Sequence, residues 1–161
     1  MNLELDLDFE KAFDPSRFFF GVANAPYLSE GGYNYPEGIK NSYAVLELSD
    51  KIERSRESTR FWVDYEKQVK LAASLGLNAF RMGVDWARVQ PSTSLEKIDP
   101  PPWDDDAVDG YARIVETIIK HEMSPIVTLH HFTHPAWAGL DFWMHDEGPD
   151  LLVEYQLRVE E

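Results

Sequence analysis

The sequence of 161 residues contains no cysteine. This absence excludes disulfides, thiolate chemistry and cysteine-ligated metal centres. Basic residues are also scarce, since 15 lysines and arginines face 29 aspartates and glutamates, for a formal net charge of −14. Because such a surface repels polyanions, we expect no binding to nucleic acid or to anionic lipid. The acidity favours solubility, or adaptation to a salt-rich cytoplasm, over a specific cationic partner.

Long apolar runs are absent as well, and none is long enough to span a bilayer. The first ten residues lack the basic start and the continuous apolar core of a secretion signal. We therefore expect a cytoplasmic protein without a transmembrane segment. What the chain does contain is 43% hydrophobic and 13% aromatic residues, which is enough for one ordinary core. We expect residues 1–161 to belong to a single domain.

The most informative segment covers residues 128–137, with the sequence TLHHFTHPAW. A short apolar run there ends in three histidines, a proline and a tryptophan. This pattern predicts a buried strand whose carboxyl end opens into a polar loop lined by aromatic rings. In parallel α/β folds that end of a strand is where substrates are bound.

Strand-like and helix-like segments alternate along the chain. Three successive βα units of this kind predict a parallel sheet with right-handed crossovers. Glycine, tyrosine, asparagine, proline and serine are frequent in residues 24–52, and they favour a long ordered loop. The expected strands are residues 17–23, which should be buried, 78–84 and 124–130, and the expected helices are residues 59–75, 104–121 and 149–159.

Two of these helices have clear signals. The first carries apolar residues every three or four positions, and Gly76 is placed to end it. The second begins at three aspartates, residues 104–106, whose charges oppose the exposed amide dipoles. The buried stripes are expected to consist of Phe61, Tyr65, Val69, Ala72 and Leu75 in the first helix, and of Val108, Tyr111, Val115 and Ile118 in the second, with His121 in its last turn.

Three motifs in order resemble those of one enzyme family. Residues 20–31 (FGVANAPYLSEG) resemble the opening signature of family 1 glycoside hydrolases, the β-glucosidase and β-galactosidase group. Residues 81–91 (RMGVDWARVQP) resemble the second-strand motif of that family, and residues 128–135 resemble its third-strand motif. The sequences RFW at residue 60, FRMGVDW at residue 80 and HH at residue 130 are nearest to the galactolipid-remodelling branch, whose members transfer galactose between membrane galactolipids.

The resemblance implies an α/β fold of the (β/α)₈ TIM-barrel type. A complete barrel takes roughly 250 residues and eight strands, whereas this chain offers about three βα units. We therefore expect the N-terminal portion of a barrel, with open edge strands and an uncovered sheet face. Such a chain is an N-terminal fragment, a split-gene product or a piece that needs partners.

Catalysis in this family requires two carboxyl groups. Retaining glycosidases place them roughly 5 to 5.5 Å apart across the sugar, and in the family they follow later strands, beyond Glu161. The resemblance thus implies no catalytic residue in this chain, no activity of the chain alone and no cofactor. When completed, the barrel would act on β-linked glucosides or galactosides by retaining chemistry. Two alternatives are a galactolipid galactosyltransferase-like transglycosylase and a non-catalytic partial barrel that associates with itself or with the missing half.

The substrate-binding residues implied by the resemblance lie in the second and third motifs. Arg81 matches the arginine that holds the nucleophile ionised, and His131 matches the histidine that hydrogen-bonds a sugar hydroxyl. Phe132 stands where the family usually has a tryptophan, and can pack against a sugar face. Trp86 and Trp143 complete this set. Trp143, like Trp137, either shapes an acceptor subsite or belongs to the core.

Other positions depart from the family or carry no catalytic role. Leu28 stands where most members have a glutamine that grips two sugar hydroxyls, so those hydrogen bonds are lost. We expect Glu30 to be a structural loop carboxylate. For Asp85 a sugar contact and a pairing with Arg88 are both open, and we favour the pairing.

A metal site is the remaining alternative, because imidazole and carboxylate ligands suit zinc or non-haem iron. The spacing of the candidates lacks a regular ligand pattern. Two adjacent histidines on a strand should also point to opposite faces, so we expect no metal. The candidate ligands are His130, His131, His134, Asp141 and His145.

Overall fold

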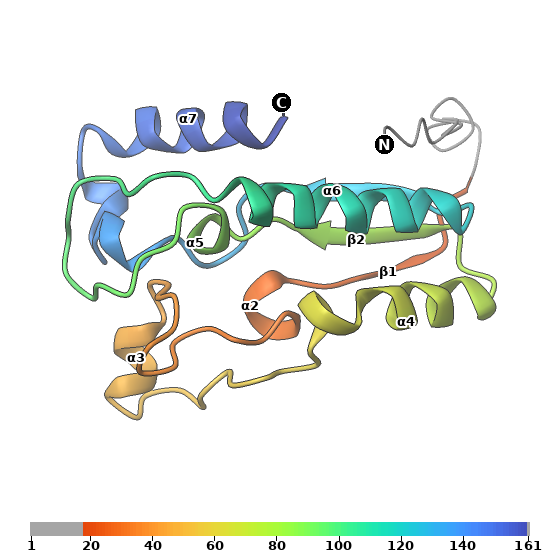
Figure 1. Cartoon of the computed structure of the whole chain (residues 1–161), viewed down its shortest axis with the longest axis horizontal. Helices are drawn as coiled ribbons and strands as arrows, with labels where there is room; N and C mark the ends of the chain where they lie inside the picture. Colours follow the sequence, from red (N-terminus) through yellow and green to blue (C-terminus); the bar gives the residue numbers. More distant parts are fainter. Residues whose placement is uncertain (1–17, 161) are drawn as a thin grey trace.

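The computed structural model describes residues 18–160, so the expectation about a secretion signal lies outside the described residues. Strands and helices alternate as the sequence predicts (Figure 1). The elements are β1 (Gly21–Ala23), α2 (Pro26–Ser29), α3 (Ala44–Leu48), α4 (Phe61–Ser74), β2 (Ala79–Gly83), α5 (Trp86–Val89), α6 (Asp105–Lys120), β3 (Ser124–Thr128), the 3-10 helices η1 (Ala136–Ala138) and η2 (Phe142–Met144), and α7 (Gly148–Glu160).

The three strands form one parallel sheet in the order β1-β2-β3, which confirms the predicted sheet. In its register, Phe80 of β2 lies beside Val22 of β1 and beside Pro125 of β3. The prediction that β1 is buried is wrong: all three of its residues are exposed, because β1 lies at the edge of the sheet that the structure describes and pairs there with β2 alone. Strand β3 ends at Thr128, earlier than predicted, so the histidines follow the strand instead of lying on it.

Helix α4 confirms the first predicted helix. Phe61 is buried and its ring stacks on that of Phe80, with the ring centroids 5.7 Å apart. Gly76 has φ +79, a left-handed conformation that glycine adopts without strain, and it follows the helix end as predicted. Leu75 is exposed, because the helix ends at Ser74 and no longer directs this side chain toward the sheet.

Helix α6 confirms the second predicted helix. The side chain of Asp104 accepts a hydrogen bond from the Ala107 amide at 3.0 Å, as an N-cap residue does. Tyr111 and Ile118 are buried as expected. Val108 and Val115 are only half-buried, because they line an apolar groove between α6, β3 and α7 with a volume of about 580 Å³.

Residues 24–52 contain two short helices, α2 and α3, where the composition predicted a loop alone. Pro26 occupies the first turn of α2, where its missing amide costs nothing and its fixed φ suits the helix. Both helices have at most five residues, too few for a periodic apolar pattern. They fold over the carboxyl end of the sheet (Figure 1).

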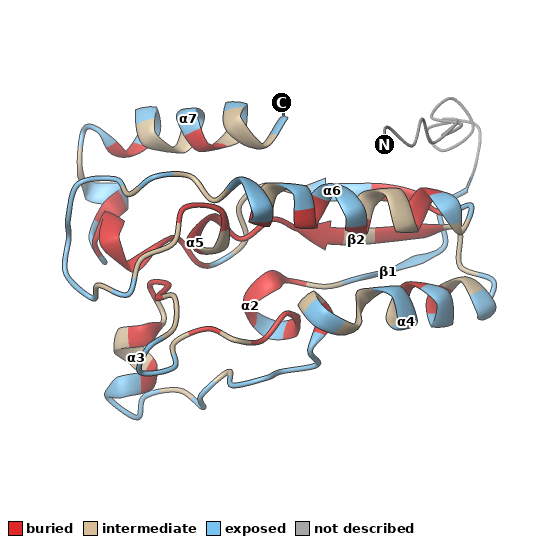
Figure 2. Cartoon of the chain, viewed as in Figure 1, coloured by how far each residue is buried: buried red, intermediate tan, exposed pale blue. Residues whose placement is uncertain are grey.

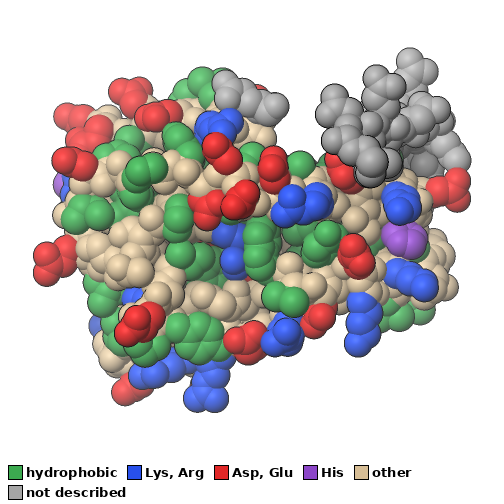
Figure 3. Space-filling model, in the orientation of Figure 1, with side chains coloured by type: hydrophobic (Ala, Val, Ile, Leu, Met, Phe, Trp, Pro, Cys, Tyr) green, Lys and Arg blue, Asp and Glu red, His purple; other side chains and the backbone are tan. Residues whose placement is uncertain are grey.

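The core lies between the sheet and helices α4, α6 and α7. Figure 2 shows β2 buried along almost its whole length, whereas β1 is exposed. Figure 3 shows acidic side chains spread over the face in view, with exposed hydrophobic side chains between them. Strand β2 is therefore the central and most buried strand of the sheet.

Candidate functional site

Arg81 and His131 meet at the carboxyl end of the sheet. Arg81 lies on β2 and His131 follows β3, and because these strands are parallel their carboxyl ends share one edge. Nη2 of Arg81 is 3.4 Å from Nδ1 of His131, and it also donates to the backbone oxygen of Asn24 at 3.4 Å. Nε of Arg81 is buried and has no partner in the described structure. Two residues that the sequence predicted for one site are thus brought together.

The contact assigns the tautomer of His131. A guanidinium group only donates hydrogen bonds, so Nδ1 of a neutral His131 must accept, and the ring proton lies on Nε2. At 3.4 Å this hydrogen bond is weak. Its consequence is that His131 retains one N–H donor, which suits a hydroxyl oxygen.

Phe132 lies at the rim of the same site. Its side chain is 53% exposed, and its ring is tilted against that of His131 with the centroids 4.1 Å apart. An exposed ring next to a hydrogen-bonding imidazole can pack against the apolar face of a sugar while the imidazole binds a hydroxyl.

Of the five tryptophans, the three considered for substrate contact differ in burial. Trp143 is 56% exposed and lies edge-on to the ring of His130, with the centroids 5.3 Å apart. Trp137 is buried in the core, and its Nε1 donates to the backbone oxygen of Gln90 at 2.9 Å.

Trp86, in contrast, is wrongly predicted to contact substrate. It is 1% exposed, stacks on Tyr155 and donates from Nε1 to Oε1 of Gln90 at 2.8 Å. Its ring lies in the core, edge-on to the rings of Trp137 and Phe142, and is therefore closed off from a ligand.

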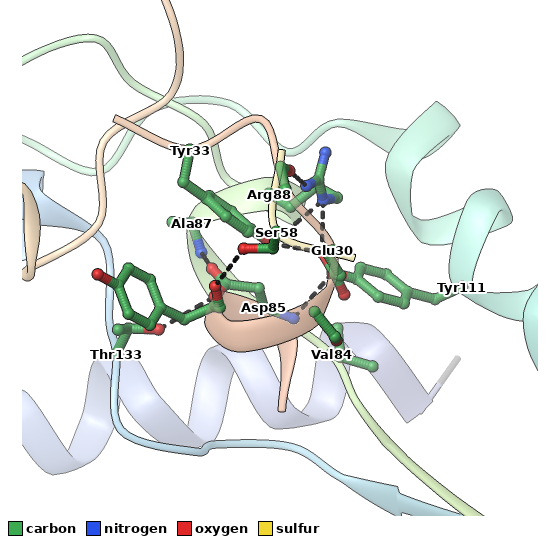
Figure 4. Close-up of polar contacts among 12 residues, drawn as sticks. Glu30, Tyr33, Ser58, Val84, Asp85, Ala87, Arg88, Tyr111 and Thr133 are labelled. Atoms are coloured by element: carbon green, nitrogen blue, oxygen red, sulfur yellow. Dashed lines mark hydrogen bonds and ion pairs between the residues drawn. The ribbon is translucent and has the colours of Figure 1, made fainter. Parts of the chain in front are cut away.

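A buried polar cluster underlies the site (Figure 4). Glu30 is its centre: Oε2 lies 2.8 Å from Nε of Arg88 in an ion pair, and both carboxylate oxygens accept from the hydroxyl of Tyr111, at 2.8 and 3.0 Å. The hydroxyl of Tyr33 donates to Glu30 as well. These three donors engage both carboxylate oxygens of Glu30 and give it a structural role.

The favoured pairing of Asp85 with Arg88 is wrong. Arg88 pairs with Glu30, and its Nη2 donates to the backbone oxygen of Gly31 at 2.9 Å. Asp85 is the N-cap of α5: Oδ1 accepts from the Ala87 amide at 2.8 Å, while Oδ2 accepts from the hydroxyl of Thr133 at 3.0 Å. An aspartate directly before a helix start is an N-cap signal, but α5 is too short to be recognised from the sequence.

The environment of Asp85 favours its neutral form. Burial, and next the negative charge of Glu30, raise the pKa of Asp85 to about 7. Arg88 opposes this shift without cancelling it. Sequence reasoning missed this group, because Glu30 and Asp85 come together only in the fold.

The histidines of the loop do not form a metal centre in the part of the chain that the structure describes, where no three or more His, Cys, Asp or Glu side chains are placed to hold an ion. The argument that His130 and His131 occupy opposite faces of a strand does not apply, since β3 ends before them. Burial lowers the pKa of His130 and of His134, and Nε2 of His134 lies 2.9 Å from the backbone oxygen of Gly139. Across residues 18–160, the helices are also too short or too polar to cross a membrane.

Comparison with known proteins identifies the scaffold. The family model for glycosyl hydrolase family 1 matches residues 10–140. The chain belongs to this family. A solved beta-glucosidase in its apo form superimposes with a TM-score of 0.75 at 31% identity, covering 89% of this chain and 34% of the glucosidase. The three-stranded sheet with its helices is therefore part of a TIM barrel, as predicted.

The curated relatives include a 6-phospho-beta-galactosidase and two chloroplastic SFR2 proteins. The chain is 29% identical over 146 residues to 6-phospho-beta-galactosidase 1 of Streptococcus pneumoniae R6, covering 88% of this chain and 29% of that protein. It is 37% identical over 84 residues to the chloroplastic beta-glucosidase-like SFR2 of Oryza sativa subsp. japonica, covering 52% and 13%. Identity to the chloroplastic galactolipid galactosyltransferase SFR2 of Arabidopsis thaliana is 32% over 103 residues, covering 63% and 16%. The chain spans less than a third of the length of each of these relatives.

Proposed function

We propose that this chain forms the substrate-binding N-terminal part of a retaining β-glycosidase, which hydrolyses O-glycosyl bonds once further barrel strands complete it. The observation that carries the proposal is the contact between Arg81 and His131 at the carboxyl edge of a family 1 sheet. That edge is where TIM barrels bind their substrates.

Each of the two residues has a defined task in this proposal. His131 donates from Nε2 to a sugar hydroxyl, and Phe132 packs against the apolar face of the same sugar. Arg81 has a buried Nε without a partner, and an unpartnered buried donor of a cation is costly. A carboxylate from a later strand would satisfy it, and the positive charge would keep that carboxylate ionised as the nucleophile.

The chemistry requires two carboxyl groups roughly 5 Å apart. Glu30 and Asp85 are both buried and engaged in internal hydrogen bonds, so neither reaches an open site. We propose that both catalytic carboxyl groups come from the rest of the barrel, and that this chain alone is inactive.

Complementation tests the proposal. The chain alone should release no 4-nitrophenol from 4-nitrophenyl β-glucoside or from 4-nitrophenyl β-galactoside. Hydrolysis should appear when the remaining strands of a family 1 β-glucosidase are co-produced with the chain. Arg81→Ala should lower that activity by about 100-fold or more, since it removes the electrostatic partner of the nucleophile. The matched control, Arg113→Ala on the exposed side of α6, should leave it unchanged. Hydrolysis by the chain alone, or activity insensitive to Arg81→Ala, would contradict the proposal.

A second candidate function is galactosyl transfer between galactolipids. It is favoured by the similarity to the Arabidopsis galactolipid galactosyltransferase. Leu28, 59% exposed, adds an apolar side chain in the first-strand motif, where most of the family has a glutamine. With monogalactosyl lipid as the only substrate, the completed barrel would then transfer galactose from one molecule to another, forming digalactosyl lipid and the deglycosylated lipid of the donor. A hydrolase would instead release free galactose and the same deglycosylated lipid.

A further inference from the structure

The backbone at Phe132 adopts a strained turn. Phe132 has φ +71, and the Thr133 amide donates to the backbone oxygen of His131 at 2.9 Å, which closes a three-residue γ-turn. A positive φ at the centre of such a turn is rare and unfavourable for a residue with a bulky side chain. The turn therefore persists only if contacts outside it hold it in place.

Those contacts begin at the residue after the turn. Thr133 is 3% exposed, and its hydroxyl donates to Oδ2 of Asp85 at 3.0 Å. The next residue is fixed by its backbone, because the oxygen of His134 accepts from the Ser42 amide at 2.7 Å. On the other side of the turn, the Val84 amide donates to the backbone oxygen of Thr128 at 3.1 Å. The turn thus connects two anchored points.

Asp85 is itself rigidly held. Its amide donates to the hydroxyl of Tyr111 at 3.0 Å, and its Oδ1 caps α5 through the Ala87 amide. It follows the carboxyl end of β2, the strand that carries Arg81. One carboxyl group therefore ties the turn that follows His131 to the segment that follows the strand of Arg81. Figure 4 shows the contact between Asp85 and Thr133.

We propose that Asp85 and Thr133 are positioning residues, whose mutual hydrogen bond holds the turn at Phe132 and thereby sets the contact between His131 and Arg81. This inference deepens the proposed function, because the value of the positioning rests on His131 as a sugar-binding residue. The hydrogen bond itself acts without a sugar, so it is open to a separate test.

The test measures the NMR signals of the two ring nitrogens of His131, which report its tautomer. In the ¹⁵N-labelled chain of 161 residues, long-range ¹H–¹⁵N spectra at pH 8 should show His131 with its proton on Nε2. Thr133→Val removes the hydroxyl at constant volume, so the turn should relax and both ring-nitrogen signals should move toward those of a free mixture of tautomers. Thr133→Ser keeps the hydroxyl and should restore the signals of the unmodified chain.

A matched control comes from α6, where the exposed Thr117 donates its hydroxyl to the backbone oxygen of Arg113 at 2.8 Å. Thr117→Val should leave His131 unchanged. Asp85→Ser provides a second variant in case Thr133→Val does not fold, because serine still caps α5 but is too short to reach Thr133. It should shift His131 as Thr133→Val does.

The proposal is overturned if His131 keeps its signals in whichever of the two variants folds, as circular dichroism would establish. A merely stabilising hydrogen bond would lower the denaturation midpoint without moving these signals. The result is also independent of the proposed function: shifted His131 signals with no hydrolysis after complementation would leave the positioning intact and refute the glycosidase role.

Discussion

At the scale of single residues, Asp85 shows what the sequence could and could not predict. The family motif placed it beside Arg81 and Trp86, but its partners come from segments far along the chain. Glu30 and Thr133 converge on it only after the sheet has formed. Side-chain pairings of this range depend on the fold, and so the expected ion pair with Arg88 was replaced by the pair of Arg88 with Glu30.

The raised pKa of Asp85 predicts how stability depends on pH. Its ordinary value is 3.8 and burial raises it to about 7, so the folded chain holds a proton that the unfolded chain releases between these values. Asp85 therefore lowers the free energy of unfolding as pH rises from about 4 to about 7, by up to roughly 1.4 kcal/mol per unit of pKa shift. Below pH 4 this contribution to stability is fully present.

Asp85→Asn removes the titrating group. Between about pH 4 and pH 7 the unmodified chain should therefore lose unfolding free energy relative to the Asp85→Asn variant, as measured by urea denaturation. Comparison with the variant cancels the opposite contribution of His130 and His134, whose lowered pKa values add stability as pH rises toward 6.5. Besides burial, Glu30 raises the pKa of Asp85, whereas Arg88, the hydroxyl of Thr133 and the Ala87 amide lower it. Parallel pH profiles for the two chains would contradict this account, because they would mean that Asp85 has the same pKa in the folded and the unfolded chain.

At the scale of elements, length decides what the sequence reveals. Helices α4, α6 and α7 were all predicted, because each is long enough for several turns of apolar periodicity and two have clear start or stop signals. Helices α2, α3 and α5 have four or five residues and carry no such period. The edge position of β1 was also hidden, since an apolar run does not say on how many sides a strand is covered.

The pairing of β1 with β2 requires glycine at position 21. A Cβ there would lie 2.1 Å from the backbone oxygen of Ala79, a distance that the sheet cannot accommodate without moving. Gly21→Ala should lower the free energy of unfolding by about 1–3 kcal/mol, with faster amide exchange in β1.

The control is Gly38→Ala, whose Cβ would meet its nearest neighbour at 3.4 Å, an ordinary contact. It should stay close to the unmodified chain in urea denaturation. Equal effects of the two substitutions would mean that β1 does not pack against β2 as closely as described.

At the scale of the whole molecule, the chain is part of a barrel. Among residues 18–160, no further strand lies beside β1 or β3, so both edges of the sheet are open, and apolar side chains such as Val22, Ile126 and Val127 are exposed on it. The family motifs predicted this incompleteness, since eight strands do not fit in 161 residues. They do not identify what covers the open edges.

If copies of the chain cover these surfaces for one another, mass action makes stability depend on concentration. The denaturation midpoint should rise by several degrees over a hundredfold increase in protein concentration, and sedimentation velocity should show a dimer or larger species. A constant midpoint and a single monomer boundary would refute self-association and leave the missing barrel strands as the partner.

Covalent trapping tests the central claim most directly. Retaining glycosidases form a glycosyl-enzyme intermediate on the nucleophile, and a 2-deoxy-2-fluoro-β-glucoside with a good leaving group makes it long-lived. Treated with this reagent, the complemented barrel should carry the label on the complementing chain, while the 161-residue chain keeps its unmodified mass. A label on any carboxylate of this chain, Glu30 or Asp85 included, would contradict the account.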